Sequence, residues 1–143
     1  MAEPESGGAR DILSVPAPSL ADFEALADRA RAALPDVFRE MTGALLVRVD
    51  DFADEETLAE LDIEDPFELT GLYQGVALTE KSVLDVPVEP DVVWLYRRPI
   101  LDEWVERGDV PLDRLVAHVL VHEIAHHFGW SDERIAEIDD WRL

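Results

Sequence analysis

Hydrophobic residues recur at helical spacing near both ends of the chain and as short runs in its middle. After residue 19, apolar side chains fall three or four positions apart until a proline ends the run: Leu20, Phe23, Leu26, Ala27, Ala30 and then Pro35. This spacing predicts a helix. Residues 44–49 and 71–78 are short runs rich in branched or aromatic side chains, and they predict two strands, the first of them buried.

The strand predicted most clearly covers residues 91–97 and is flanked by Pro90 and Pro99. Because proline cannot donate to a neighbouring strand, we expect this strand at an edge of the sheet. A short helix is expected over residues 99–105. A longer helix is expected to begin with Asp109 as its cap and Pro111 in its first turn, and to stop at Gly129.

A last helix is expected over residues 131–141, so the order of elements is a helix, a small sheet and then helices. That order predicts an α+β fold. Residues 1–18 mix Gly, Pro, Ser and Glu without periodicity and predict a flexible tail. The remaining residues, 19–143, are long enough for one domain with a substantial core, and we expect them to form that single domain.

The charge balance narrows the class of function. The 143 residues carry 33 Asp and Glu against 12 Lys and Arg, a formal net charge of −21. Nucleic acids and anionic membrane surfaces both require a basic surface, so neither is an expected partner. The absence of cysteine excludes a disulfide scaffold and a thiol nucleophile. The acidic start lacks the pattern of a secretory signal, and a soluble cytoplasmic protein is expected.

The residues that can carry chemistry are concentrated in one segment. All four histidines lie within ten residues, His118, His122, His126 and His127, and two of them form a His-Glu-x-x-His pattern with Glu123 between them. On a helix, positions i and i+4 share a face, so His122 and His126 can converge on one ion. Glu123 can contact a water on that ion without binding the ion itself.

The residues after this pattern extend it. Gly129 allows the chain to reverse after the helix, and Asp132 follows three positions later, where a carboxylate can return to the ion. The stretch from His122 to Asp132 resembles the extended zinc signature of zincin metallopeptidases, in a metzincin-like variant with Asp as third ligand. The chain resembles most closely the small bacterial zincin-like (minimal) metallopeptidase family, also through its Gly71-Leu72-Tyr73-x-Gly75 segment.

That resemblance implies a compact zincin-like fold, in which a small mixed sheet packs on an active-site helix and flanking helices. It implies a zinc ion held by His122, His126 and Asp132, and hydrolysis of a peptide bond. Glu123 would be the general base. The peptide substrate is expected to be extended. If strand 92–97 is an edge strand, the peptide could pair with it through main-chain hydrogen bonds.

Several alternatives stay open beside this prediction. If the role of Asp132 is only to stabilise the first turn of the last helix through the helix dipole, Glu133 or Glu137 would be the third zinc ligand in its place. His118 is expected to be a core or cap residue, and His127 to point away from the ion. Tyr73 and Tyr96 are the candidate donors to an oxyanion. A second class of function is a zinc-stabilised binding module with little proteolytic activity.

The acidity is partly local. Between Arg48 and Lys81 there are eleven acidic residues and no base. Residues 50–69 are expected to form a solvated loop with a helical turn near residues 58–61, and their spacing does not match a calcium-binding loop. If this segment borders a substrate groove, it would favour cationic peptides over acidic ones.

Overall fold

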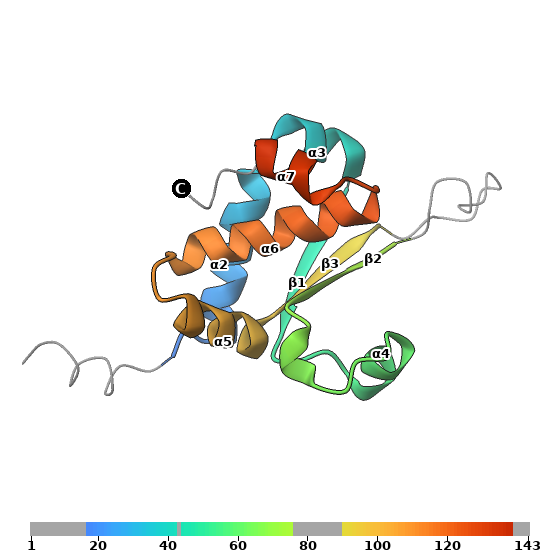
Figure 1. Cartoon of the computed structure of the whole chain (residues 1–143). Coiled ribbons are helices and arrows are strands. Elements are labelled where there is room, and N and C mark those ends of the chain that lie inside the picture. The colour runs from blue at the N-terminus through green and yellow to red at the C-terminus, as the bar shows by residue number, and fades with distance from the viewer. Residues whose placement is uncertain (1–16, 43, 76–89, 139–143) are drawn as a thin grey trace, which may run out of the picture.

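The computed structural model describes residues 17–42, 44–75 and 90–138, without the side chains of Asp132 and Ile138. Most of the predicted tail and the ends of two predicted elements therefore lie outside the described residues. In chain order, the elements are α2 (Leu20–Ala32), α3 (Asp36–Thr42), β1 (Leu46–Asp50), α4 (Glu55–Glu60), the 3₁₀ turn η1 (Pro66–Glu68), β2 (Gly71–Gln74), β3 (Val92–Tyr96), α5 (Arg97–Arg107), α6 (Leu112–His127) and α7 (Asp132–Ile138). The fold is α+β, as predicted (Figure 1).

The first predicted helix is confirmed as α2, and a capping box begins it. The Ser19 hydroxyl accepts a hydrogen bond from the Asp22 amide, and the Asp22 carboxylate accepts one from the Ser19 amide, at 3.1 and 2.9 Å. These two bonds satisfy amide groups that have no partner within the helix. Pro35 ends the run but also starts α3, which the hydrophobic pattern did not indicate. The Pro35 carbonyl accepts from the Phe38 amide at 2.9 Å.

The three strands form one mixed sheet in the order β1-β3-β2. β3 pairs in parallel with β1 and antiparallel with β2. The prediction that this strand lies at an edge is therefore wrong, because β3 is the central strand. The physical reason is its length: β3 runs only from Val92 to Tyr96, so Pro90 and Pro99 lie outside the ladder and remove none of its hydrogen bonds.

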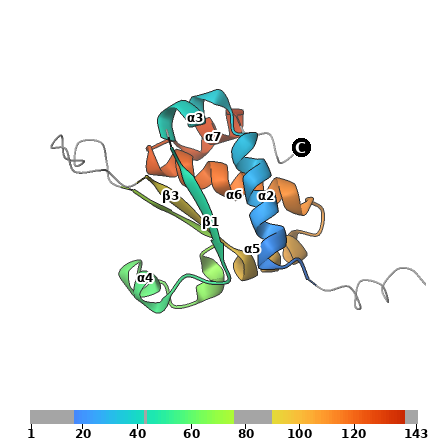
Figure 2. The ribbon, with the colours of Figure 1, turned by 180° about the vertical axis from the view of Figure 1, so that it is seen from behind.

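The two faces of the sheet are covered differently. Val93 and Leu95 are fully buried on the face that packs against α2 and α6. Trp94 and Tyr96 alternate with them and face a smaller apolar cluster formed with Ala53 and other residues of the acidic segment. Figure 1 shows α6 on one side of the sheet and α4 on the other, and Figure 2 shows α2 alongside β1.

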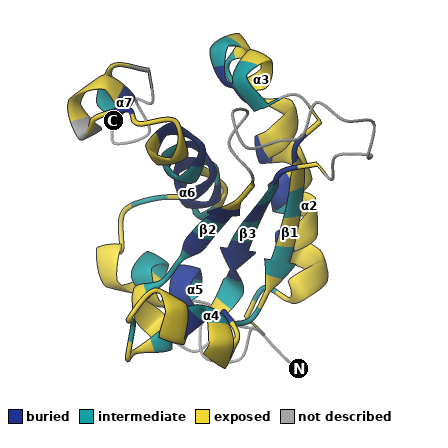
Figure 3. Ribbon diagram, turned by 90° about the vertical axis from the view of Figure 1, so that its right-hand side faces the viewer, coloured by how far each residue is buried: buried dark blue, intermediate teal, exposed yellow. Residues whose placement is uncertain are grey.

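β1 lies where residues 44–49 were expected, but it is not buried as predicted. Its side chains alternate between exposed and half-buried, and Leu46 is 38% exposed. An edge strand has a neighbour on only one side, which explains the difference. Figure 3 shows the contrast with β3 and α6, which are the most buried parts of the structure.

α6 is the most buried helix of the described structure. It starts later than predicted: Pro111 occupies the cap position in extended conformation, and no side chain caps the helix, so the predicted role of Asp109 is wrong. It ends as predicted, because Gly129 has a φ of +84°, a conformation that favours glycine. Its buried residues are Leu115, Val116, His118, Val119, Leu120, Val121, Ile124 and Ala125.

The acidic segment contains the expected helical turn, α4, and packs against the sheet. Asp54 caps α4 by accepting a hydrogen bond from the Thr57 amide at 2.7 Å. Asp51 forms an ion pair of 2.6 Å with Arg97, the first residue of α5. In the part of the chain that the structure describes, no helix is both long and apolar enough to cross a membrane.

The central position of β3 can be tested with two leucines of the sheet. We expect Leu95→Ala to reduce the free energy of unfolding by about 2–5 kcal/mol, because it leaves a cavity between β3 and the helices. Leu46→Ala, on the half-exposed edge strand, should cost less than about 1 kcal/mol. Urea unfolding followed by circular dichroism measures both values, and equal losses would contradict the arrangement.

Candidate active site

The last two turns of α6 present His122, Glu123 and His126. The His122 and His126 rings are one helical turn apart, with centroids separated by 5.3 Å and planes inclined by 58°. His122 is half-buried and His126 is exposed. The two imidazoles therefore lie on one face of the helix, at the point where α6 passes from the core to the surface.

His118 extends this row by one turn toward the core. It is 9% exposed, and its ring centroid lies 4.0 Å from that of His122. The prediction of a core histidine is consistent with this burial. His127 points elsewhere, as predicted: its ring stacks on Tyr73 at 3.9 Å, with an interplanar angle of 12°.

Glu123 is half-buried, on the side of α6 that faces β2. Gly71 of β2 lies so close that a Cβ atom there would be 2.9 Å from Val119 Cγ1 and 3.1 Å from Glu123 Cγ. Burial raises the pKa of the Glu123 carboxyl to about 7, although a hydrogen bond from the Tyr73 backbone acts in the opposite direction. A carboxyl group with this pKa can exchange a proton near neutral pH.

Tyr73 connects β2 to the end of α6 and to the start of β3. Its hydroxyl donates to Asp91 Oδ2 at 2.6 Å, its ring stacks on His127, and its edge contacts Phe128. Asp91 is itself 9% exposed. Because the hydroxyl already donates to a buried carboxylate, Tyr73 is a poor candidate for an oxyanion donor, and its backbone contact with Glu123 is the more direct link to the site.

Sequence reasoning did not assign a role to Gly71 or Asp91. The short sequence Gly71-Leu72-Tyr73-x-Gly75 contained the signal, since both glycines sit where a side chain would collide. A Cβ on Gly75 would lie 2.6 Å from the Asp91 carboxyl group. Two glycines spaced around a tyrosine therefore mark close approaches of β2 to α6 and to Asp91.

The donors fit zinc in kind, and two of them are described. Imidazole nitrogen and carboxylate oxygen are ligands that zinc takes, usually in a tetrahedral set. Among the described side chains, no group of three or more His, Cys, Asp or Glu is placed to hold a metal ion. The predicted third ligand, Asp132, begins α7, and its side chain lies outside the described residues.

The backbone reverses after α6, at Gly129. The Trp130 amide donates to the Ala125 carbonyl at 2.9 Å, just after the Gly129 turn. Trp130 is buried with its ring centroid 5.0 Å from that of Phe38, and Ile135 of α7 is also buried. The start of α7 is thus held against the body of the domain rather than projecting from it.

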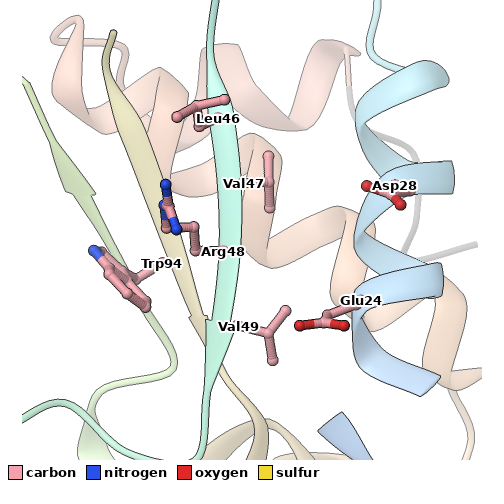
Figure 4. A pocket seen from close by; sticks show the side chains of 7 residues that line it. All are labelled: Glu24, Asp28, Leu46, Val47, Arg48, Val49 and Trp94. Atoms are coloured by element: carbon pink, nitrogen blue, oxygen red, sulfur yellow. The ribbon is translucent and has the colours of Figure 1, made fainter. Parts of the chain in front are cut away.

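A groove that none of these residues lines lies at another edge of the sheet. It has a volume of about 380 Å³ and runs between α2 and β1, with Glu24 and Asp28 projecting from α2 toward Val47 and Val49 (Figure 4). β1 is at the opposite edge of the sheet from β2. No predicted site residue lines this groove, so the chemistry of the side chains, and not the size of the cavity, locates the candidate active site.

An α+β fold with two imidazoles one turn apart and a desolvated glutamate between them is typical of metal-dependent hydrolases. A family model described as zincin-like metallopeptidase matches residues 42–142, which include the sheet, α6 and α7. The chain therefore belongs to the zincin-like metallopeptidase family, and the predicted family is confirmed. No curated protein matches the sequence.

The burial of Glu123 predicts a pH-dependent stability of the metal-free protein. The folded carboxyl has a raised pKa, so the folded state binds more protons than the unfolded state between about pH 4.5 and 7, and stability falls as pH rises through that interval. Over this interval, we expect the unmodified protein to lose about 1–3 kcal/mol more of its free energy of unfolding than the Glu123→Gln variant loses. Urea unfolding in chelator at pH 4.5 and 7.5 measures it, and the exposed Glu60→Gln should leave the slope unchanged.

The Tyr73–Asp91 hydrogen bond can be tested against a second tyrosine. Tyr73→Phe leaves the buried Asp91 carboxylate without this donor and should cost about 1–3 kcal/mol of stability. Tyr96→Phe removes a buried hydroxyl that forms no hydrogen bond with any described residue, and should change stability by less than about 1 kcal/mol. Thermal unfolding of both variants makes the comparison, and the reverse order would refute it.

Proposed function

We propose that this protein is a zinc-dependent peptidase in which Glu123 is the general base. The observation that carries the proposal is the position of Glu123. Its carboxyl group is desolvated against β2, has a pKa near 7 and lies beside two imidazoles that share a face of α6. Membership of the zincin-like metallopeptidase family supports the reaction class.

In this proposal His122, His126 and Asp132 hold the zinc ion. When bound, zinc supplies Lewis-acid chemistry that acidifies water and polarises a carbonyl group. The position of His122 supports its role, because contact with His118 on one side restricts how its ring can turn. Asp132 is proposed from its place at the start of α7, directly after the reversal at Gly129.

Glu123 accepts the proton of the attacking water and passes it to the amine that leaves. A base is most effective when its pKa is near the working pH, and burial against β2 brings the pKa of the Glu123 carboxyl group to that range. The backbone hydrogen bond from Tyr73 holds the carboxylate at the edge of β2. The close approach of Gly71 to Glu123 lets β2 cover this side of the glutamate.

The proposed substrate is an extended peptide that pairs with β2 in place of β3, since β3 has neighbours on both sides. The Thr70 carbonyl accepts from the Tyr96 amide at 2.9 Å, so residues 70, 72 and 74 direct their backbone groups toward β3. Gly71 and Tyr73 then direct theirs to the opposite side, where Glu123 lies. Strand addition there would bring the scissile bond alongside the glutamate.

The decisive experiment uses zinc-loaded protein and a mixed peptide library read by mass spectrometry. We expect Glu123→Gln to reduce cleavage by about 100-fold or more, because general-base catalysis contributes about 10²–10⁴. Zinc content should remain one ion per chain. Cleavage that is undiminished in the variant would contradict the role of Glu123. Stoichiometric zinc without cleavage in the unmodified protein would favour the zinc-stabilised binding module.

Matched variants test the third ligand separately. Asp132→Asn should weaken zinc binding, measured by chelator competition, whereas Glu133→Gln and Glu137→Gln on the same helix should not. These three substitutions change the local charge equally. If a glutamate variant loses zinc and Asp132→Asn does not, the assignment passes to that glutamate.

A further inference from the structure

A second polar pocket lies on the face of the sheet turned away from α6. It has a volume of about 160 Å³, and six residues from three strands and α4 line it: Asp50, Asp54, Thr57, Gln74, Trp94 and Tyr96. The side chains of Trp94 and Tyr96 alternate with the core residues Val93 and Leu95, which places them on this face. None of the residues assigned to zinc or to proton transfer lines this pocket.

Two carboxylates of the pocket carry charge that the described structure does not neutralise. Asp50 accepts one hydrogen bond from the Asp51 amide and Asp54 accepts one from the Thr57 amide, at 2.8 and 2.7 Å. Within the described ranges, neither forms an ion pair with a base, unlike the neighbouring Asp51, which pairs with Arg97. The pocket thus has two negative charges near each other and no cation of its own.

The opposite wall is aromatic, and its geometry is held by neighbours. The Trp94 indole N–H donates to Gln74 Oε1 at 2.9 Å, which sets the orientation of the ring. The Trp94 and Tyr96 rings are nearly parallel, inclined by 4° with centroids 6.5 Å apart. The negative face of an aromatic ring attracts cations, and tryptophan does so most strongly.

The hydrogen bonding of the Tyr96 hydroxyl gives independent evidence that this pocket binds a ligand. Tyr96 is only 4% exposed, yet its hydroxyl forms no hydrogen bond with any residue that the structure describes. Buried polar groups almost always have a partner. Burial and the charges of Asp54, Asp50 and Glu123 raise the pKa of this phenol to about 12, so it stays neutral and its oxygen can accept a hydrogen bond.

We propose that this pocket binds the guanidinium group of an arginine side chain from another polypeptide. The guanidinium offers charge to Asp50 and Asp54, N–H donors to the Tyr96 oxygen, and a flat surface to the Trp94 ring. The volume is below the range of about 300–1,000 Å³ typical of small-molecule sites, and suits the end of one side chain.

The donor set argues for an organic cation over a divalent metal ion. Calcium takes six to eight oxygen ligands, whereas the pocket supplies two carboxylates. Among the described side chains, no histidine or further acidic residue joins these two aspartates in a group that could hold a metal ion. Arg48 is the register neighbour of Trp94 on β1 but forms no ion pair with either aspartate in the described structure. The proposal depends on neither zinc nor Glu123.

The test is a titration of the full chain with Nα-acetyl-arginine methylamide, followed through the Trp94 indole N–H signal in NMR spectra at 150 mM salt. Loss of that signal in Trp94→Phe identifies it. We expect a saturable shift with the arginine compound and none with the citrulline analogue, which has the same shape but no charge. Equal binding of the two compounds, or a shift with neither, would overturn the proposal.

Substitutions in the pocket locate the binding. Asp50→Asn with Asp54→Asn should weaken binding at least tenfold, and should preserve the fold because asparagine also accepts the two backbone hydrogen bonds and caps helices well. Glu56→Gln with Glu60→Gln removes the same charge from the exposed side of α4 and should have little effect. If the control variant loses as much affinity for the arginine compound, general attraction by the acidic surface explains the binding and the pocket proposal is wrong.

Two further measurements complete the test. Tyr96→Phe removes one oxygen and should weaken arginine binding several-fold, and an unchanged Kd would remove that oxygen from the site. Calcium chloride, titrated alone, should leave the Trp94 signal in place. A saturable response to calcium that displaces the arginine compound would identify a metal site instead.

Discussion

The packing of α6 against the sheet and α2 is the constraint on which the rest of the structure depends. Leu115, Leu120 and Ile124 are fully buried, so apolar surface must cover this helix on several sides. The sheet supplies one cover through Val93 and Leu95, and α2 supplies another through Phe23 and Ala27. The C-terminal end of α6 leaves the core, and the imidazole and carboxylate groups of the candidate site are concentrated there.

The same packing makes Glu123 costly to the fold and useful for chemistry. The Glu123 carboxylate, on the side of α6 that approaches Gly71, has lost much of its hydration, so its charged form is less stable than in water. A glycine on β2 permits this approach, because any side chain would separate the strand from the helix. The free energy lost in burial is the reason that the carboxyl group titrates near neutrality.

Acidity has more than one role in this chain. Asp51 is paired with Arg97, Asp54 caps α4, and Asp22 completes the capping box of α2, so a share of the negative charge maintains local structure. The acidic segment was predicted as a solvated loop, and its charged residues other than Asp51 are exposed. Ala53 and Leu58, however, anchor it on the sheet face opposite α6. This anchoring brings Asp50 and Asp54 beside the aromatic residues of β3.

Local patterns in the sequence determined the three strands, the helices other than α3, the α+β class and the cluster of His122, Glu123 and His126. They could do so because helical periodicity and the spacing of i and i+4 act over a few residues. The tertiary structure alone decided that β3 is central, that Pro111 and not Asp109 begins α6, and that Gly71 and Tyr73 contact Glu123. These features depend on which distant segments share the core. Strand order and desolvation arise from long-range packing, and a single sequence records such packing only indirectly, here through two glycines placed around a tyrosine.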